Sequence, residues 1–595
     1  MAYAVSFALL MHRVSLKVTG AQGQGVNSVG EICGKGLKQA GYCVFGYREY
    51  MSLIIGGHSS YQIDVSYERV ESSEVQCDII MNFNHYGFEQ HHTEVKDGGI
   101  FLHQTPMWKF TNEQNAYFAE HNITVMYLPV EEMLKKLKAP QILSNMYITS
   151  IVWMLLGQSA EVLKELVQEQ FGHKGEKIVQ KNYECIEEGM TFLAEHPELK
   201  PVEMMQPDPK WKECLYLTGS EAIGLGLIHA GCRMYTGYPM TPASPLLKYL
   251  AEMQNKTGMI IKQAEDEITA VQMASGAMLM GTRAATGTSG GGFDLMTETI
   301  SLNGIIENPL VVFLFQRQGP STGLPTWTGQ GDLHLAVGAA HGEFPRLVLG
   351  VSDAQDGFDL MPEAFNYAEE FQTVVIIVAD KQIAEGLYTQ EPYDLTKAEI
   401  RRGNLVTDPA ELEKLTSADR YNPAAKDGVS PRWLPGAKAA TYCAQGDEHD
   451  AEGNVSESGE NAIAQMEKRM AKMEALKKAL PDPDVYGEQK SPDVLLVSWG
   501  SNASAIHDAL KHEAFTKKKI AYVHYSYLWP LKTEKLHALA KKAKTSILIE
   551  SNYQGQLGRM IRQECGLAFD HQILKYDGRP FFYNELVEKL SSALS

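Results

Sequence analysis

The sequence has few cysteines for its length, and none of them is paired along the chain. Eight cysteines are spread over 595 residues, and no two have the Cys-x-x-Cys spacing from which iron–sulfur clusters and structural zinc sites are usually built. We therefore predict that this chain holds no cluster and no metal ion of its own. Isolated cysteines in a large chain are also typical of a protein that stays in a reducing cytoplasm.

The sequence also lacks an apolar run of the roughly 20 residues that a membrane-spanning helix needs. The apolar start, Ala4–Met11, has no basic segment before it and no small-residue cleavage site after it. We interpret it as a short strand rather than a signal peptide.

Positive charge is scarce as well. The 54 basic residues are outnumbered by 73 acidic residues, and the formal net charge is −19. Such a charge repels nucleic acid and acidic membrane surfaces, so neither is expected as a partner. It also disfavours direct docking of an acidic redox protein on this chain.

The chain is too long for one hydrophobic core, and its pattern predicts three α/β domains. Short apolar runs that end at Gly, Asn or Asp alternate with helical patterns, which is typical of parallel sheets. The units are predicted at residues 1–200, 210–400 and 490–595. Residues 401–485 are rich in Pro, Gly, Asp and Asn, but Trp433 and other apolar residues interrupt them. We expect this stretch to be an ordered connecting segment that ends in a helix at Ile463–Leu480.

The apolar runs give the expected strands. In the first unit they are Val14–Thr19, Asp78–Phe83 and Gly99–Leu102, and residues 144–196 are expected to be mostly helical. In the second unit they are Gly281–Thr286, Pro309–Phe315, Arg346–Leu349 and Thr373–Val378. In the third unit they are Val494–Val497, Ile520–His524 and Ser546–Ile549.

A glycine-rich turn follows the first strand, at Gly20–Gly25, and a helical pattern runs from Val29 to Ala40. Such a turn exposes backbone N–H groups at the positive end of a helix, which suits phosphate. The third position is Gln22, where the dinucleotide-binding pattern has glycine. Binding of a nucleotide or coenzyme A phosphate and a plain tight turn both stay open.

Two short motifs in the second unit hold a polar side chain in a fixed position, one in a proline-rich loop and one at the start of a helix. Prolines flank Thr241 in the run Tyr238–Pro245, so its hydroxyl is held in a loop, where it could bind a carboxylate or carbonyl, or simply belong to a rigid turn. Glu267 opens a helix of small residues. An acid there caps the helix, but a partly buried one also has a raised pKa and can hold a proton against a ring nitrogen.

Two glycine-rich loops follow predicted buried strands. The run Thr286–Gly292 lets a ligand touch the backbone, and it also fits the Gly-x-Ser-x-Gly pattern of a hydrolase with Ser289 as nucleophile. The polar run Gln316–Asp332 is predicted to be a site loop at the carboxyl end of a parallel strand.

Two acidic and histidine-containing runs are weaker signals. His91, His92 and Glu94, and separately Glu448–Asp450, could ligate metal, but solvated loops are the simpler interpretation. The chain contains neither a Gly-x-x-x-x-Gly-Lys phosphate loop nor a Gly-Asp-Gly run.

Taken in order, the motifs resemble the fused gamma–alpha subunit of 2-oxoacid:ferredoxin oxidoreductases over nearly the whole chain. Gly20–Gly25 and Ser52–Gln62 resemble the gamma domain, which is associated with coenzyme A. Tyr238–Pro242, Glu265–Ile268, Thr288–Phe293 and Gly319–Thr326 resemble the pyrimidine-binding domain for thiamine diphosphate. Ser498–Asn502, Tyr527–Leu531 and Glu550–Leu557 resemble a transketolase C-terminal-like domain.

The resemblance implies roles for single residues. Glu267 matches the glutamate that activates thiamine diphosphate, and Thr241 matches the threonine that contacts the substrate. Thr288, Ser289 and Gly290 would bind the cofactor, and Arg317 would help to bind the substrate. Gly23, Gln24 and Gly25 are the candidates for binding coenzyme A.

The resemblance also implies partners. Because the Gly-Asp-Gly run is missing, Mg²⁺ and the cofactor's diphosphate, together with a 4Fe–4S cluster, are expected on a beta subunit. That subunit would complete the site in an alpha2beta2 assembly that reduces ferredoxin.

The implied reaction is the oxidative, reversible decarboxylation of 2-oxoglutarate with coenzyme A to succinyl-CoA, as in the reductive tricarboxylic acid cycle. Trp327 stands where many relatives carry a basic residue. Pyruvate, branched-chain 2-oxoacids or indolepyruvate are the alternative substrates. A transketolase-like enzyme complete in one chain and a non-catalytic coenzyme A-binding scaffold are alternatives of other kinds.

Overall fold

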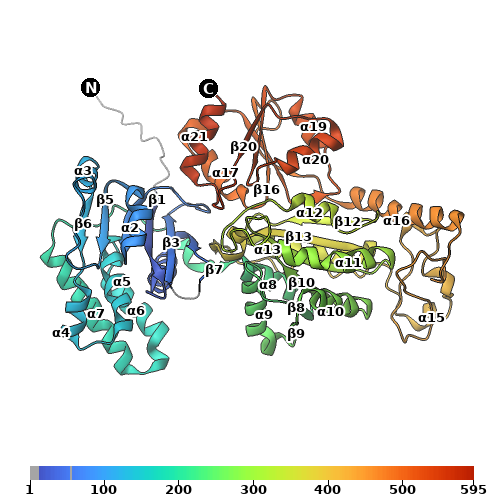
Figure 1. Cartoon of the computed structure of the whole chain (residues 1–595), viewed down its shortest axis with the longest axis horizontal. Helices are drawn as coiled ribbons and strands as arrows, with labels where there is room; N and C mark the ends of the chain where they lie inside the picture. Colours follow the sequence, from blue (N-terminus) through green and yellow to red (C-terminus); the bar gives the residue numbers. More distant parts are fainter. Residues whose placement is uncertain (1–12, 54–55) are drawn as a thin grey trace.

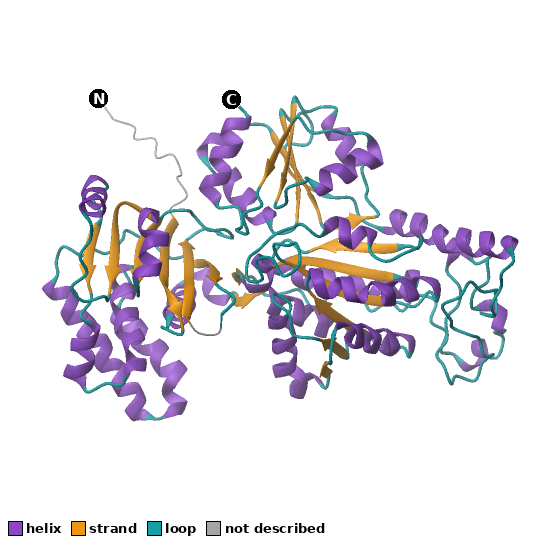
Figure 2. Ribbon diagram, viewed as in Figure 1, coloured by secondary structure: helices purple, strands orange, loops and turns teal. Residues whose placement is uncertain are grey.

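Three mixed sheets of eight, seven and five strands organise the computed structural model, which describes residues 13–53 and 56–595 (Figure 1). Helices cover the sheets (Figure 2), so the predicted α/β fold class is confirmed. The strand expected at Ala4–Met11 lies outside the described residues. None of the helices formed by the described residues is long and apolar enough to cross a membrane.

The first sheet has the order β6-β5-β4-β1-β3-β2-β14-β7. Its strands are β1 Arg13–Gln22, β2 Cys43–Tyr50, β3 Gly56–Ser66, β4 Cys77–Asn82, β5 Val95–His103, β6 Thr124–Tyr127, β7 Leu215–Thr218 and β14 Leu387–Gln390. The three strands expected here are β1, β4 and β5. The helical region expected at 144–196 is α5 Ser144–Leu155, α6 Ala160–Phe171 and α7 Glu176–Glu195. Helices α5 and α6 pack with α1 Val26–Ala40, and α7 packs on α5 and α6.

The expectation of a parallel first sheet is wrong in part. Strands β1, β4, β5 and β6 are parallel, but β3 is antiparallel to both β1 and β2. Only residues 51–55 join β2 to β3, and a parallel pair needs a crossover of a dozen or more residues. The short connection therefore forces an antiparallel hairpin.

The second sheet has the order β18-β12-β13-β11-β10-β8-β9 and carries the candidate site. Its strands are β8 Met234–Gly237, β9 Ile260–Gln263, β10 Ala284–Thr288, β11 Leu310–Gln316, β12 Arg346–Gly350, β13 Val374–Asp380 and β18 Tyr527–Trp529. All neighbours pair in parallel except β12 and β18. The buried strands β11 and β13 consist almost entirely of apolar residues, as expected for strands covered on both faces.

The third sheet, with order β15-β17-β16-β19-β20, lies above the other two in Figure 1. Its strands are β15 Asp484–Gly487, β16 Val494–Trp499, β17 Ile520–Tyr525, β19 Thr545–Glu550 and β20 His571–Leu574. The three strands expected here are β16, β17 and β19.

The segment between the second and third sheets packs through buried charge. Its long helix α16 Gly459–Ala479 is the helix expected at Ile463–Leu480. From this helix Lys468 and Lys472 both contact the buried carboxylate of Glu307, which follows the helix α11 Gly290–Ile305.

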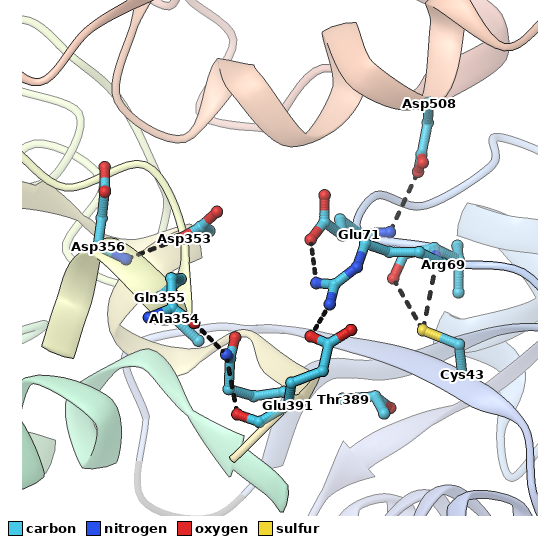
Figure 3. Close-up of polar contacts among 12 residues, drawn as sticks. Cys43, Arg69, Glu71, Asp353, Ala354, Gln355, Asp356, Thr389, Glu391 and Asp508 are labelled. Atoms are coloured by element: carbon cyan, nitrogen blue, oxygen red, sulfur yellow. Dashed lines mark hydrogen bonds and ion pairs between the residues drawn. The ribbon is translucent and has the colours of Figure 1, made fainter. Parts of the chain in front are cut away.

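The three units meet at a polar junction (Figure 3). Asp508, in helix α17 Asn502–Leu510 of the third unit, accepts hydrogen bonds from Arg13 and from the backbone of Glu71 in the first unit. Arg69 pairs with Glu71 and with Glu391. Asp353, which caps helix α13 Ala354–Phe371 of the second unit, lies beside this junction in the same view.

Candidate active site

Three parallel strands bring the predicted loops of the second unit to one edge of its sheet. Strand β10 pairs in parallel with β8 on one side and β11 on the other. Since parallel strands end at the same edge, the loops after Gly237, Thr288 and Gln316 come together there. Ligands of open α/β sheets bind at this edge.

Glu267 is the first residue of helix α10 Glu267–Leu279, whose N-cap is Asp266. The Asp266 side chain accepts a hydrogen bond from the backbone of Thr269 at 2.7 Å, so the helix start is capped without Glu267. The Glu267 side chain is buried, and its Oε1 atom has no hydrogen-bond partner among the described residues. A buried, unpartnered carboxyl oxygen costs free energy unless a ligand satisfies it.

Thr288 and Gly292 lie against Glu267. A Cβ atom at Gly292 would stand 2.0 Å from Thr288 Oγ1 and 2.7 Å from Glu267 Oε1, so only glycine permits this approach. The Thr288 hydroxyl donates a weak hydrogen bond to Met240 Sδ at 3.6 Å. Glu267, Thr288 and the loop that carries Thr241 are therefore neighbours.

Arg317, Thr241 and Gly290 form the other side of the same edge. The guanidinium of Arg317 donates from Nη1 to the carbonyl of Thr241 at 2.8 Å. Burial lowers the pKa of Arg317, and nearby Asp332 acts in the opposite direction. A Cβ atom at Gly290 would lie 3.1 Å from Asp332 Oδ2. The structure thus brings together the residues predicted from three separate loops.

Asp332 was missed as a single residue, although it ends the predicted site loop. Burial raises the pKa of Asp332 to about 6; Asp294 also raises it and Arg317 lowers it. Its backbone N–H donates to Gln316 at 3.0 Å, which fixes the end of the loop. The feature that could have identified Asp332 is its position as the N-cap of the helix α12 Leu333–Gly338.

Ser289 lies between these groups but is not set up as a nucleophile. Its side chain is fully buried, and its hydroxyl has no hydrogen-bond partner among the described residues. A serine nucleophile needs a base within hydrogen-bond reach, so the hydrolase interpretation gains no support.

The glycine turn of the first unit starts later than expected. Gly20, Ala21 and Gln22 still pair with β3, and the turn is made by Gly23 and Gly25, with φ values of 90° and 98°. Gly25 then serves as the N-cap of α1. The side chain of Gln24 folds back to accept from the backbone of Ala21 at 2.7 Å.

A short stretch of β2 and its following loop links this turn to the site loop of the second unit. Gln22 Nε2 donates to the carbonyl of Met51 at 2.6 Å. The hydroxyl of Thr326, in the loop after β11, donates to the carbonyl of the adjacent Tyr50. The candidate coenzyme A turn and the site loop are therefore joined through two consecutive residues.

Trp327, also in this loop, is covered by an arginine from the third unit. The guanidinium of Arg579 stacks over the Trp327 ring at 4.3 Å, and its Nε lies 3.8 Å from Glu49. A cation is thus present at the loop although residue 327 itself is not basic.

The two acidic and histidine-containing runs form protein contacts. His91 bonds through Nδ1 to Glu94 at 2.6 Å and through Nε2 to His58 at 2.9 Å, and Lys17 pairs with the same glutamate. Glu448 pairs with Arg469. Across residues 13–53 and 56–595, no group of three or more His, Cys, Asp or Glu side chains has an arrangement that could hold a metal ion.

Family models match two parts of the chain. A model described as pyruvate flavodoxin/ferredoxin oxidoreductase, thiamine diP-binding, matches residues 225–470, which contain the site. A model described as pyruvate ferredoxin/flavodoxin oxidoreductase matches residues 15–192. The fold and the site thus define a thiamine-diphosphate-binding oxidoreductase.

Individual relatives extend the match to the whole chain. The 2-oxoacid:ferredoxin oxidoreductase subunit alpha of Sulfolobus sp is 32% identical, over 97% of this chain and 96% of the relative. The 2-oxoglutarate oxidoreductase subunit KorA of Mycobacterium tuberculosis is 26% identical, over 91% of this chain and 84% of the relative. The chain belongs to the 2-oxoacid:ferredoxin oxidoreductase family, among its alpha subunits.

A solved structure shares the complete architecture. The 2-oxoglutarate:ferredoxin oxidoreductase from Magnetococcus marinus, solved with 2-oxoglutarate, coenzyme A and succinyl-CoA bound, is 28% identical. It aligns with a TM-score of 0.90 over 98% of this chain and 100% of that one. The family predicted from the motifs is confirmed.

Proposed function

We propose that this alpha subunit decarboxylates 2-oxoglutarate oxidatively and reversibly, with coenzyme A as acyl acceptor and ferredoxin as electron acceptor, to give succinyl-CoA and CO2. The observation that carries the proposal is the buried carboxyl group of Glu267, whose Oε1 atom has no partner among the described residues. It lies beside the loops that hold Thr241 and Arg317.

The residues at this edge fit thiamine diphosphate. Glu267 offers an unpartnered oxygen, and a Cβ at the neighbouring Gly291 would meet no atom within 4 Å, which leaves room for a ligand against the backbone. Thr288, Ser289 and Gly290 would line the cofactor. When bound, thiamine diphosphate supplies the electron sink for loss of CO2.

The chain's own residues would prepare that chemistry. The unpartnered Oε1 atom of Glu267 would form a hydrogen bond with a ring nitrogen of the cofactor. Thr241 would orient the substrate through its hydroxyl. Arg317, tied to the Thr241 carbonyl, would hold the substrate's carboxylate.

The choice of 2-oxoglutarate rests on two arginines at one loop. Arg317 begins the loop after β11, and Arg579 stacks on Trp327 within it. A dicarboxylate such as 2-oxoglutarate needs a second cation, whereas pyruvate, branched-chain 2-oxoacids and indolepyruvate do not. We expect Arg579→Gln to raise KM for 2-oxoglutarate about tenfold or more, by loss of a charge-assisted contact. The KM for pyruvate should stay the same, and equal effects on both substrates would contradict this assignment.

A beta subunit would complete the site. Three large apolar side chains are exposed on the elements that form this edge: Tyr238 directly after β8, Ile268 next to Glu267, and Leu295 in helix α11. Exposed apolar side chains gathered around a site mark a protein interface. The partner would carry Mg²⁺ and the 4Fe–4S cluster that passes electrons to ferredoxin, in an alpha2beta2 assembly in the cytoplasm. Gly23, Gln24 and Gly25 would bind coenzyme A.

The test is viologen reduction by the chain assembled with its beta subunit, with thiamine diphosphate, Mg²⁺, coenzyme A and a panel of 2-oxoacids under anaerobic conditions. We expect Glu267→Gln to lower kcat by roughly 10²–10⁴-fold, with an unchanged melting temperature. The matched control is Glu265→Gln, an exposed acid two residues away. Full activity in Glu267→Gln would refute the site. Silence of the wild-type complex with every oxoacid would favour a coenzyme A-binding scaffold.

A further inference from the structure

A cavity of about 780 Å³ opens between the helices α1, α5, α6 and α7 of the first unit, away from the candidate active site. The helices α5, α6 and α7 form the lower left part of Figure 1. Much of the wall is apolar, with side chains from four segments: Ile32, Leu143, Met146, Leu166, Phe171 and Ile178. A volume in the range of roughly 300–1,000 Å³ with such a lining suits a small organic ligand.

The rim of the cavity is basic. Five lysines line it, with Glu31 as the one acidic residue among the lining side chains: Lys35, Lys138, Lys174, Lys177 and Lys181. This excess of positive charge is local, because the whole chain has a formal net charge of −19.

The lysines differ in their ion pairing. Lys181 pairs with Glu184 at 2.6 Å, whereas Lys138 and Lys177 have no ion pair with any of residues 13–53 and 56–595. These two exposed ammonium groups are therefore available to an anion.

Two further observations point to a ligand. The side-chain Oδ1 of Asn145, which lines the cavity and packs against Gly25, is buried and has no hydrogen-bond partner among the described residues. At the rim, Ile142 and Ile178 remain 78% and 42% exposed. Apolar side chains next to free ammonium groups suit a ligand that is itself apolar at one end and anionic at the other.

We propose that this cavity binds an amphipathic carboxylate, with its apolar chain against the Leu166 and Phe171 wall and its carboxylate at the rim lysines Lys138 and Lys177. This inference goes beyond the proposed function, because no residue assigned to decarboxylation lines the cavity. The chemistry indicates a medium- or long-chain fatty acid anion as the class of ligand.

The test is a binding titration of the purified full-length chain with the fluorescent carboxylate 11-(dansylamino)undecanoate, followed by competition. We expect one site per chain, displacement by decanoate, and at least fivefold weaker displacement by 1-decanol, which keeps the apolar chain without the charge. Coenzyme A alone should not displace the probe.

Two variants and a control locate the site. Leu166→Trp should fill the cavity and weaken probe binding at least about tenfold. The double variant Lys138→Gln/Lys177→Gln removes only exposed charges and should weaken it about fivefold. Lys109→Gln/Lys135→Gln makes the same charge change at exposed lysines outside the cavity and should bind as the wild type does.

Three outcomes would overturn the proposal. They are wild-type affinity in the Lys138/Lys177 double variant, an equal loss in the Lys109/Lys135 control, and displacement by coenzyme A alone, which would make the cavity part of the coenzyme A site. If Leu166→Trp does not fold, probe binding by the two lysine double variants tests the proposal by itself. Glu267, Thr241 and Arg317 do not line this cavity, so failure here leaves the proposed decarboxylation untouched.

Discussion

Replacement of Asp508 by Asn tests whether the junction in Figure 3 holds the third unit on the first. Asp508 and Arg13 form an ion pair at 2.6 Å with both side chains fully buried. The same carboxylate accepts hydrogen bonds from the Ser72 hydroxyl at 2.7 Å and from the backbone of Ser72 at 3.1 Å and of Glu71 at 3.2 Å. The amide of Asn would keep the shape and lose the charge.

The expected cost follows from burial. Removing one member of a buried ion pair leaves the other as an uncompensated charge and destabilises by about 3–5 kcal/mol. Here that group would be the Arg13 guanidinium, which would keep the bond from Nη1 to the Ser72 carbonyl at 2.9 Å and the weaker attraction of Asp64 and Glu74. A loss of this size is a large part of the stability of a single domain, which is about 5–15 kcal/mol.

The contribution of Asp508 to the free energy of unfolding should also depend on pH, in a direction that its pKa determines. Burial alone would raise the pKa of Asp508, but Arg13, Lys511 and the donated hydrogen bonds hold it below the ordinary value. A depressed pKa in the folded state contributes stability above the unfolded pKa of about 3.9, and this contribution is lost as the pH falls through the folded value. The difference between wild type and Asp508→Asn should therefore be complete at neutral pH and shrink in acid.

The assay is urea unfolding of the full chain, together with hydrogen exchange of residues 69–75. We expect Asp508→Asn to lower the first unfolding midpoint and to speed exchange in that segment. The control is Asp493→Asn, at a solvent-exposed ion pair with Lys544 in the same unit, which should leave both readouts unchanged. Equal midpoints for Asp508→Asn and Asp493→Asn would refute the reasoning.

Two further changes probe other charged groups. Glu307→Gln should lower the urea midpoint of the full chain, with a loss of about 3–5 kcal/mol, because the buried side chains of Lys468 and Lys472 would lose their shared carboxylate; an unchanged midpoint would contradict this. Asp332→Asn should remove an ionisation near pH 6 from the kcat/KM profile of the assembled enzyme, since burial raises the pKa of Asp332 to about 6; persistence of that ionisation would show that it belongs to another group.

Buried strands were predictable because their signal is local. The apolar runs at Pro309–Phe315 and Thr373–Val378 became β11 and β13, within one or two residues at each end. A continuous apolar run bounded by polar residues has few other interpretations in an α/β chain.

Short strands were not predictable in the same way. Strands β7 and β14 have four residues each, and they complete the first sheet although they stand in the sequence beside the second. Strand β18 lies within the third unit in the sequence, but it pairs with β12 of the second sheet. The sequence of such a short strand does not indicate which strand it pairs with, because pairing depends on packing between distant parts of the chain.

The candidate site shows the same division. The identity of Glu267, Thr241 and Arg317 came from motifs, since each motif is continuous in the sequence. The contacts between these residues could not be predicted from the motifs, because the hydrogen bond from Arg317 to the Thr241 carbonyl joins residues 76 positions apart. The role of Asp332 depends on its burial beside Gly290, and the sequence of a polar loop does not show which of its residues are buried.

Charge on a helix is the most ambiguous of these signals. Lys138 follows helix α4 Val130–Leu137 and Lys177 lies in the first turn of α7, and most lysines at such positions are solvated. Only the positions of α1 and residues 138–146 turn Lys138 and Lys177 into the rim of one cavity. A net charge of −19 hides such a basic rim, because net charge sums over the surface while ligands respond to the local field. The sequence therefore supports the assignment of chemistry at continuous motifs, and binding sites built from separate helices have to be found in the fold.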